Sequence, residues 1–158
     1  MAVRKTIRQH CIEELHALLV AMRDEDAPGG IVWNNVLKEN LDDLDYQQLP
    51  AVGIEEGEEV IDDHMWPVII RKLTVFIEFR FLGSSQQFGV DVYDRFNYYL
   101  GLLQELIGTN RQTSNYWYDI HEAGNSPRIV DRDDPLPGGV LIIDIHYRSK
   151  NDDPYTRL

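Results

Sequence analysis

Apolar and polar residues alternate strictly in the middle of the chain. The stretch KLTVFIEFRF divides into two phases, with Leu73, Val75, Ile77, Phe79 and Phe81 on one and Lys72, Thr74, Phe76, Glu78 and Arg80 on the other. Period-two alternation with one apolar phase is typical of a β-strand that buries one face. We therefore expect a strand that starts at Val68 and buries the first set.

Two later stretches alternate in the same way. In one, Leu141, Ile143, Ile145 and Tyr147 alternate with Ile142, Asp144, His146 and Arg148; in the other, Tyr116, Tyr118 and Ile120 alternate with Trp117, Asp119 and His121. Both predict strands. Weaker signals predict short strands at 31–36, 51–54 and 128–131, a loop over 38–48 and an acidic turn around Gly57.

Two segments have helical periodicity instead. From about Arg4 to Arg23 and from about Val90 to Ile107, apolar residues recur every three or four positions. The first stripe is Ile7, Cys11, Leu15, Leu18, Leu19 and Met22, and the second is Val92, Phe96, Tyr99, Leu100, Leu103, Leu106 and Ile107. Pro28 and the glycines after it cannot continue the first helix.

This order of elements predicts an α+β fold in one domain over residues 1–158. We expect a mixed, mostly antiparallel sheet of four to five strands, with two main helices packed on one face. The residues expected to be buried together are Leu15, Ile77, Phe79, Phe96, Leu103 and Ile143.

The opposite sheet face is expected to mix charged, polar and large apolar groups. Such a mixture favours a subunit or partner interface over ordinary solvated surface. The predicted interface residues are Lys72, Phe76, Glu78, Arg80, Trp117, Asp119, His121, Ile142, Asp144, His146 and Arg148; Thr74 lies on the same face.

The net charge of the chain argues against some classes of function. The 158 residues include 15 Lys and Arg against 27 Asp and Glu, a formal net charge of −12. This balance argues against nucleic-acid binding and against docking to anionic lipid, because both need clustered cations. The single cysteine, Cys11, favours a reducing compartment. We find no signal peptide pattern and no apolar run long enough to cross a bilayer.

An Asp-Ile-His triplet occurs twice, at Asp119–His121 and Asp144–His146. If the two strands pair, these carboxylates and imidazoles approach one another, and a small metal-dependent enzyme is one interpretation. However, all four side chains lie on the polar phase of their strands, and no HExxH, His-x-x-x-His or Cys pair supports a ligand set. We therefore favour ordinary polar residues on an exposed face, with no metal and no cofactor.

The other candidate groups do not form a catalytic set. His64 beside Asp62 and Asp63 fits an acidic loop, and Cys11 falls on an apolar helix stripe. Ser84 and Ser85 lack a GxSxG context, the glycines of DPLPGGV precede a strand, and DRDDP lacks spaced calcium ligands. The sequence therefore predicts that the protein is not an enzyme.

The succession of segments resembles a known family. It comprises a first helix with IRQHCIEEL, then LPAVGIEEGEE, the alternating strand RKLTVFIEFRF, the helix VYDRFNYYLGLLQELI and the last strand GGVLIIDIHYRSKNDDP. This order and texture resemble the tail terminator, or tail completion, proteins of long-tailed bacteriophages over nearly the whole chain. The insert KENLDDLDYQQ and the segment DHMWP have no counterpart in that pattern.

The resemblance implies a structural virion protein, assembled in the host cytoplasm and located at the tail–neck junction. It implies a homo-hexameric ring that caps the tail tube protein, stops tube elongation and docks the neck or connector protein. Genomic DNA would pass through without specific binding, since an acidic lumen repels phosphate. Two alternatives stay open: another neck component, such as a head–tail adaptor or tube-like protein, and the metal-dependent enzyme considered above.

Overall fold

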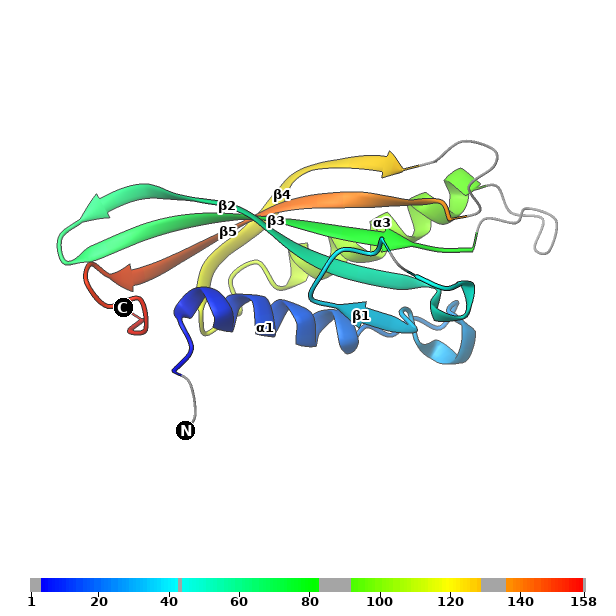
Figure 1. Ribbon diagram of the computed structural model, residues 1–158, viewed down its shortest axis with the longest axis horizontal. Helices are drawn as coiled ribbons and strands as arrows, with labels where there is room; N and C mark the ends of the chain where they lie inside the picture. Colours follow the sequence, from blue (N-terminus) through cyan, green and yellow to red (C-terminus); the bar gives the residue numbers. More distant parts are fainter. Residues whose placement is uncertain (1–3, 43, 83–91, 129–135, 158) are drawn as a thin grey trace.

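A computed structural model describes residues 4–42, 44–82, 92–128 and 136–157. Within these ranges the elements follow one another from helix to sheet to helix to sheet (Figure 1). They are α1 (Ile7–Val20), the 3-10 turn η1 (Pro28–Gly30), β1 (Asn35–Leu37), the 3-10 turn η2 (Tyr46–Gln48), β2 (Ala51–Met65), β3 (Val68–Arg80), α3 (Val92–Thr109), β4 (Trp117–Arg128) and β5 (Gly138–Lys150).

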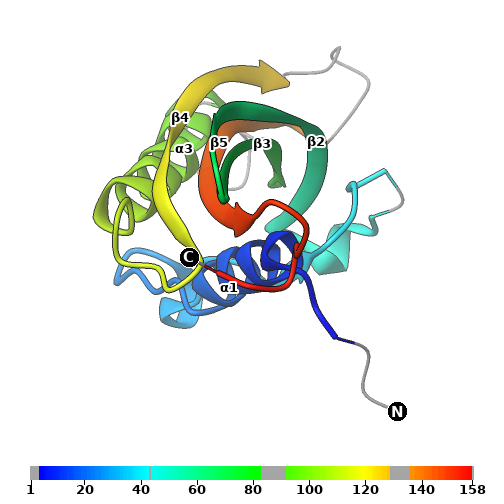
Figure 2. The ribbon, with the colours of Figure 1, turned by 90° about the vertical axis from the view of Figure 1, so that its left-hand side faces the viewer.

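The strands form one five-stranded sheet in the order β1-β2-β3-β5-β4. The short β1 runs parallel to β2, and the other neighbours are antiparallel. The α+β class and the mixed, mostly antiparallel sheet predicted from the sequence are therefore confirmed. The sheet is strongly twisted, so that its long strands wind about the long axis when seen end-on (Figure 2).

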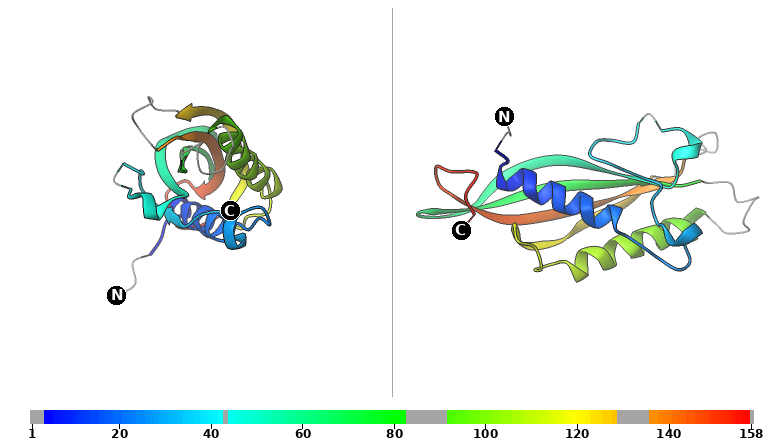
Figure 3. Two further views of the ribbon diagram at one scale, coloured as in Figure 1. Left: turned by 90° about the vertical axis from the view of Figure 1, so that its right-hand side faces the viewer. Right: turned by 90° about the horizontal axis from the view of Figure 1, so that it is seen from below.

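Both helices pack on the same side of the sheet (Figure 3). Their apolar stripes share one core cluster with the inward phase of β3 and β5. Ile77 pairs with Leu141, and Val75 pairs with Ile143, so facing residues of the two central strands bury the same face. All six residues predicted to be buried together belong to this cluster: Leu15, Ile77, Phe79, Phe96, Leu103 and Ile143.

Helix α1 begins later than the sequence predicted because Thr6 caps it. The Thr6 hydroxyl accepts from the Gln9 backbone N–H at 3.2 Å, and the Gln9 side chain accepts from the Thr6 N–H at 2.8 Å. This reciprocal pair satisfies two of the helix's unpaired N-terminal donors. His16 further anchors the helix to β1, with Nε2 3.1 Å from the Val36 carbonyl oxygen.

Helix α3 lies close to the sheet at Gly139, the second residue of β5. A β-carbon at Gly139 would lie 2.4 Å from Cε2 of Phe96 and 2.9 Å from Cζ of Phe79. The absent side chain therefore allows the two aromatic rings, stacked with centroids 5.7 Å apart, to lie on the strand. The glycine pair that precedes a predicted strand is part of the strand itself.

Strand β2 corrects the prediction of a short strand followed by an acidic turn at Gly57. The strand continues to Met65, with register shifts between Glu56 and Glu59 and between Ile61 and Asp63. At Gly57 a β-carbon would lie 2.8 Å from Cε2 of Phe76, so the glycine makes room for a ring on the neighbouring strand. It does not mark a turn.

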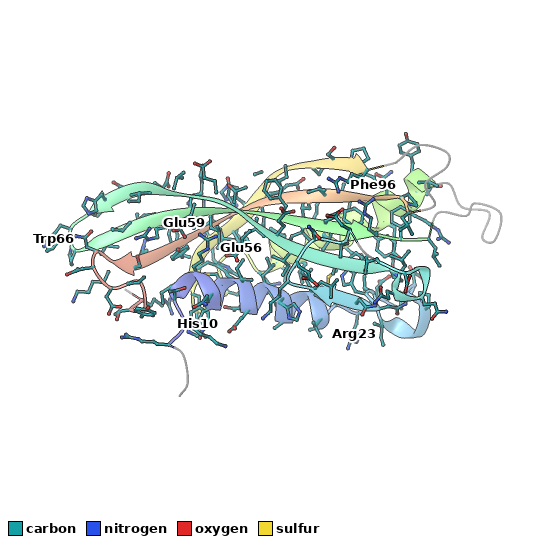
Figure 4. The ribbon with its side chains drawn as sticks, in the orientation of Figure 1. His10, Arg23, Glu56, Glu59, Trp66 and Phe96 are labelled. Carbon is teal, nitrogen blue, oxygen red and sulfur yellow. The ribbon has the colours of Figure 1, made fainter. Side chains whose placement is uncertain are left out.

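The glutamates of β2 are tolerated within a strand because cations face them. Arg8 of α1 lies 2.7 Å from Glu56 and 3.8 Å from Glu59, and Arg71 of β3 lies 3.4 Å from Glu59. The Tyr147 hydroxyl also donates to Glu59, and burial is the main cause that raises the pKa of this tyrosine. Figure 4 shows both glutamates near α1. Side-chain pairing overrides the low strand propensity of glutamate here.

The remaining boundaries differ more modestly from the prediction. The strand expected over 31–36 is reduced to β1, and the predicted loop over 38–48 contains η2. Strand β4 continues through Arg128, the first residue of the short strand predicted at 128–131; the rest of that segment lies outside the described residues.

Candidate functional site

The sheet face opposite the helices carries nearly all of the predicted interface residues. Strand register aligns them in rows: His146 lies opposite both Lys72 and Asp119, and Asp144 lies opposite both Thr74 and His121. We call this the polar face and define it by Lys72, Thr74, Phe76, Glu78, Arg80, Asp119, His121, Ile142, Asp144, His146 and Arg148.

Trp117 is the exception, and its predicted place on the polar face is wrong. It is only 1% exposed, belongs to the helix-side core and donates from Nε1 to the Asn110 carbonyl at 3.2 Å. Trp117 pairs with Tyr147 and Asp119 pairs with His146, so Tyr118 is an extra residue in β4. This bulge reverses the alternation on which the prediction relied.

The two Asp-Ile-His triplets meet on the polar face. The rings of His121 and His146 stack with centroids 5.2 Å apart and planes 23° apart. Asp119 accepts from Arg111 at 2.7 Å through one carboxylate oxygen, and its other oxygen lies 3.2 Å from Nδ1 of His121. The hydrogen bond from Arg111 is the main cause that lowers the pKa of Asp119.

The side chains of the second triplet also have partners within the protein. Asp144 accepts from the Thr74 hydroxyl at 2.8 Å, and Nδ1 of His146 lies 3.6 Å from a carboxylate oxygen of Asp62. Nε2 of His146 is buried and has no hydrogen-bond partner among the described residues. Because the two imidazoles meet face to face, their nitrogen lone pairs do not point at a common centre.

Metal ligation has little support from this geometry. Within ranges 4–42, 44–82, 92–128 and 136–157, no group of three or more His, Cys, Asp or Glu side chains is arranged to hold a metal ion. The carboxylates of Asp119 and Asp144 are already engaged by a guanidinium and a hydroxyl. These side-chain contacts instead connect β4 with β5 and β5 with β3 on the outer face of the sheet.

Glu78 and Arg80 form an internal charge cluster at the end of the same face. Glu78 is 5% exposed and accepts from Arg80 at 2.8 Å and from Arg128 at 2.7 Å. Arg80 also donates to the Leu136 carbonyl at 3.0 Å, which ties down the residues that enter β5. These charges stabilise the sheet's own strands, because a buried carboxylate requires cationic partners.

The hairpin formed by β2 and β3 is the surface that sequence reasoning missed. It extends past the end of α1, with Trp66 labelled at its end (Figure 4). Met65 pairs with Val68, so Trp66 and Pro67 form the turn. Trp66 is 74% exposed and Met65 is 61% exposed. The sequence signal is the Trp-Pro pair between two β-rich segments, which predicts a hairpin turn once Gly57 is not assigned that role.

A shallow cavity of about 230 Å³ lies beside this turn, lined by Met65, Val68, Ile70 and Arg148. The Arg148 guanidinium lies 4.7 Å from the centre of the Tyr118 ring. The end of the hairpin therefore combines exposed apolar groups with a cation, a combination common in protein interfaces.

The other candidate residues have structural roles or lie outside the described residues. Burial raises the pKa of the Cys11 thiol to about 12, which makes it a poor nucleophile. His10 stacks on Tyr116 at 4.5 Å, and His64 Nε2 lies 3.0 Å from Asn151 Oδ1. Ser84 and Ser85, and the acidic run at 131–135, lie outside the described residues.

Comparisons with known proteins identify no relative of this chain. No protein-family model matches the chain, and no curated protein matches it. Among the helices of the described residues, none is long and apolar enough to span a membrane.

Proposed function

We propose that the protein is a structural subunit that assembles with copies of itself into a ring, and that this ring caps the tail tube of a long-tailed bacteriophage. The observation that supports assembly is the projecting β2–β3 hairpin, whose turn exposes Met65 and Trp66; the tail-tube role rests on the resemblance of the segment order to tail terminator proteins. A projection with large exposed apolar groups is a feature of proteins that bind other proteins.

The chemistry of the polar face favours assembly over catalysis. Three of its carboxylates accept hydrogen bonds from neighbouring side chains: Asp119 from Arg111, Asp144 from the Thr74 hydroxyl, and Glu78 from its arginines. Catalytic sites instead combine a pocket with groups whose reactive atoms converge on one point.

The acidic character of the chain fits a ring through which DNA passes. The net charge is −12, and β2 carries exposed Glu55, Glu58, Asp62 and Asp63. Like charge repels phosphate and keeps the genome from adhering to the channel. The capped tube would then present the outer surface of the ring to a neck or connector protein.

The test has two arms. Sedimentation velocity and negative-stain images of the purified protein, alone and with tail tubes, should give closed rings of six subunits that sit at tube ends and stop further growth. A phage without this gene should produce filled but unjoined heads and tails of irregular length. A protein that stays monomeric with and without tubes, or normal particles from the deletion phage, would refute the proposal. Rings found elsewhere in the neck would instead indicate an adaptor.

A further inference from the structure

Large exposed apolar side chains gather at the end of the hairpin. Trp66 and Met65 lie at the turn, with Ile61 and Val60 further along β2. A tryptophan buries about 150–250 Å² when it is covered by a partner, and tryptophan is enriched among residues that dominate binding energies. We define the hairpin tip as Met65–Val68.

The hairpin tip is held in place by its neighbours. Strand β5 accompanies β3 to the end, with Lys150 opposite Val68. The Asn151 backbone N–H donates to the Pro67 carbonyl at 2.9 Å, and the Asn151 side chain contacts His64 at 3.0 Å. A tip that is already ordered loses little conformational entropy on binding.

An apolar groove lies at the other end of the molecule. It has a volume of about 540 Å³ and is bordered by η1 and the first turns of α3; we call it the η1–α3 groove. In Figure 4, Trp66 and Phe96, which belongs to those turns, lie at opposite ends. The lining residues are Asp26, Ala27, Pro28, Pro50, Leu82, Asp94, Arg95, Tyr98 and Tyr99.

The walls of the groove suit an aromatic side chain. Proline, leucine and tyrosine side chains provide apolar surface, and the Tyr98 hydroxyl is fixed because it donates to Asp24. Leu82, two residues beyond the end of β3, is 37% exposed. Aromatic and proline surfaces of this kind bind a tryptophan ring through contact area and stacking.

Charge is complementary between the two ends. Arg148 lines the cavity beside the hairpin tip, and exposed Lys150 lies opposite Val68. The groove carries two carboxylates, Asp26 and Asp94, against one cation, Arg95, which donates to the Leu82 carbonyl at 2.6 Å. Two exposed aspartates of β2 also lie near the tip: Asp62 faces His146, and Asp63 accepts from the His64 backbone N–H at 2.7 Å.

The sheet edges are less suited to joining copies. The long edges of the sheet are β4 and the part of β2 beyond the short β1, and both strands contain register shifts that interrupt a regular hydrogen-bonding ladder. Such irregularities discourage the addition of another strand.

We propose that the hairpin tip of one copy binds in the η1–α3 groove of a second copy, with Trp66 as the anchor. The contact joins different surfaces of identical chains, so an open assembly keeps one free tip at one end and one free groove at the other until a ring closes. The inference rests on the proposed ring, because it names the contact by which that ring's neighbours would meet.

Two variants test this contact. Trp66→Ala removes the anchor from the tip, and Leu82→Glu adds a third carboxylate to the groove. Each variant alone should remain monomeric, with association weakened at least about 30-fold. An equimolar mixture should form a heterodimer and stop there, because the intact tip of the Leu82→Glu chain binds the intact groove of the Trp66→Ala chain.

Native mass spectrometry and sedimentation velocity over a range of concentrations give the readout. Tyr155→Ala, which removes another exposed aromatic group, and Ala17→Glu, which adds a carboxylate to exposed α1 surface, should assemble like the unmodified protein. Thermal unfolding should be the same for both test variants and their controls, which separates lost contact from lost folding.

The outcomes distinguish this inference from the proposed function. If the unmodified chain forms rings but the mixture yields no heterodimer, or if Leu82→Glu alone still assembles, the tip-to-groove contact is wrong and the ring remains. If the heterodimer forms but rings do not cap tail tubes, the contact stands and the tail function is wrong. An unmodified chain that is monomeric at every concentration would overturn the contact as well.

Discussion

His121 and His146 stack across β4 and β5 with ring centroids 5.2 Å apart. The strand register brings the two triplets together, as the sequence allowed, but the rings meet through their faces. Each ring also has a carboxylate near Nδ1, from Asp119 and from Asp62. The two histidines are therefore close together, but their nitrogen lone pairs do not point at one centre, as ligands of a single metal ion must.

We predict that these triplets bind no stoichiometric metal. After dialysis, elemental analysis of the purified protein should find far less than one Zn²⁺, Mn²⁺ or Fe²⁺ per chain. The variant with both His121→Ala and His146→Ala should give the same value. A bound metal that survives dialysis and is lost in the double variant would restore the metal-dependent enzyme as the better interpretation.

The core is predicted to be sensitive at Ile77. This side chain is 0% exposed in the centre of β3, so Ile77→Ala should lower the free energy of unfolding by about 2–5 kcal/mol through lost burial and a residual cavity. Ile61→Ala is the matched control, because Ile61 is 58% exposed and its loss should cost less than about 0.5 kcal/mol. Urea denaturation measures both, and a similar cost at the two sites would contradict the assigned burial.

The sequence predicted the central strands and both helices because their periodicity comes directly from burial. Ile77 and Leu103, for example, are both buried in the core, and burial produces the alternation of the strand and the helical spacing seen in the sequence. Trp117 was assigned to the wrong face, because the bulge at Tyr118 reverses the alternation and nothing in the composition of the strand signals it.

The hairpin was missed for a different reason. Glu56 and Glu59 look like turn residues until Arg8 and Arg71, distant in sequence, are seen to face them. Long-range pairing of this kind is not visible in local propensity. With a turn expected at Gly57, the Trp66–Pro67 turn was not recognised as the end of a long hairpin.

Gly139 is predicted to resist even the smallest side chain. In Gly139→Ala the new methyl group would crowd the rings of Phe96 and Phe79, and overpacking should cost about 1–3 kcal/mol in the free energy of unfolding. Gly101→Ala is the control: Gly101 lies on exposed α3 surface with nothing within 4 Å of an added β-carbon. Alanine there should stabilise the protein by about 0.5–1 kcal/mol. Equal effects at both glycines would contradict the close approach of α3.

The pairing of Arg111 with Asp119 is predicted to have a pH signature. The folded-state pKa of Asp119 lies below its usual value, so its contribution to stability is present above the unfolded-state pKa and is lost as pH falls through the folded value. In Arg111→Ala the Asp119 pKa should rise, as NMR titration of the carboxyl group would show. The stability difference from the unmodified chain should shrink as pH falls through the folded-state pKa of Asp119.

Arg23→Ala is the control for this pH effect. The Arg23 guanidinium donates to the backbone carbonyls of Val20 and Met22, so its loss should leave the Asp119 titration unchanged. An Asp119 pKa that is the same in Arg111→Ala as in the unmodified chain would show that the ion pair is not formed in solution.

Charge reversal is predicted to have different effects at Arg80 and Arg148, although both arginines lie on the polar face. The Arg80 side chain is only 12% exposed and contacts Glu78. Arg80→Glu should therefore place two buried carboxylates together and lower the free energy of unfolding by about 3–5 kcal/mol. Arg148 is exposed, so Arg148→Glu should leave the fold intact. Because it reverses charge beside the hairpin tip, it should weaken association, and added salt should partly restore it. Calorimetry measures the change in stability, and sedimentation measures assembly. An Arg80→Glu chain that folds and still assembles would contradict the buried cluster. Unchanged assembly of Arg148→Glu would contradict the place of Arg148 in the tip-to-groove contact.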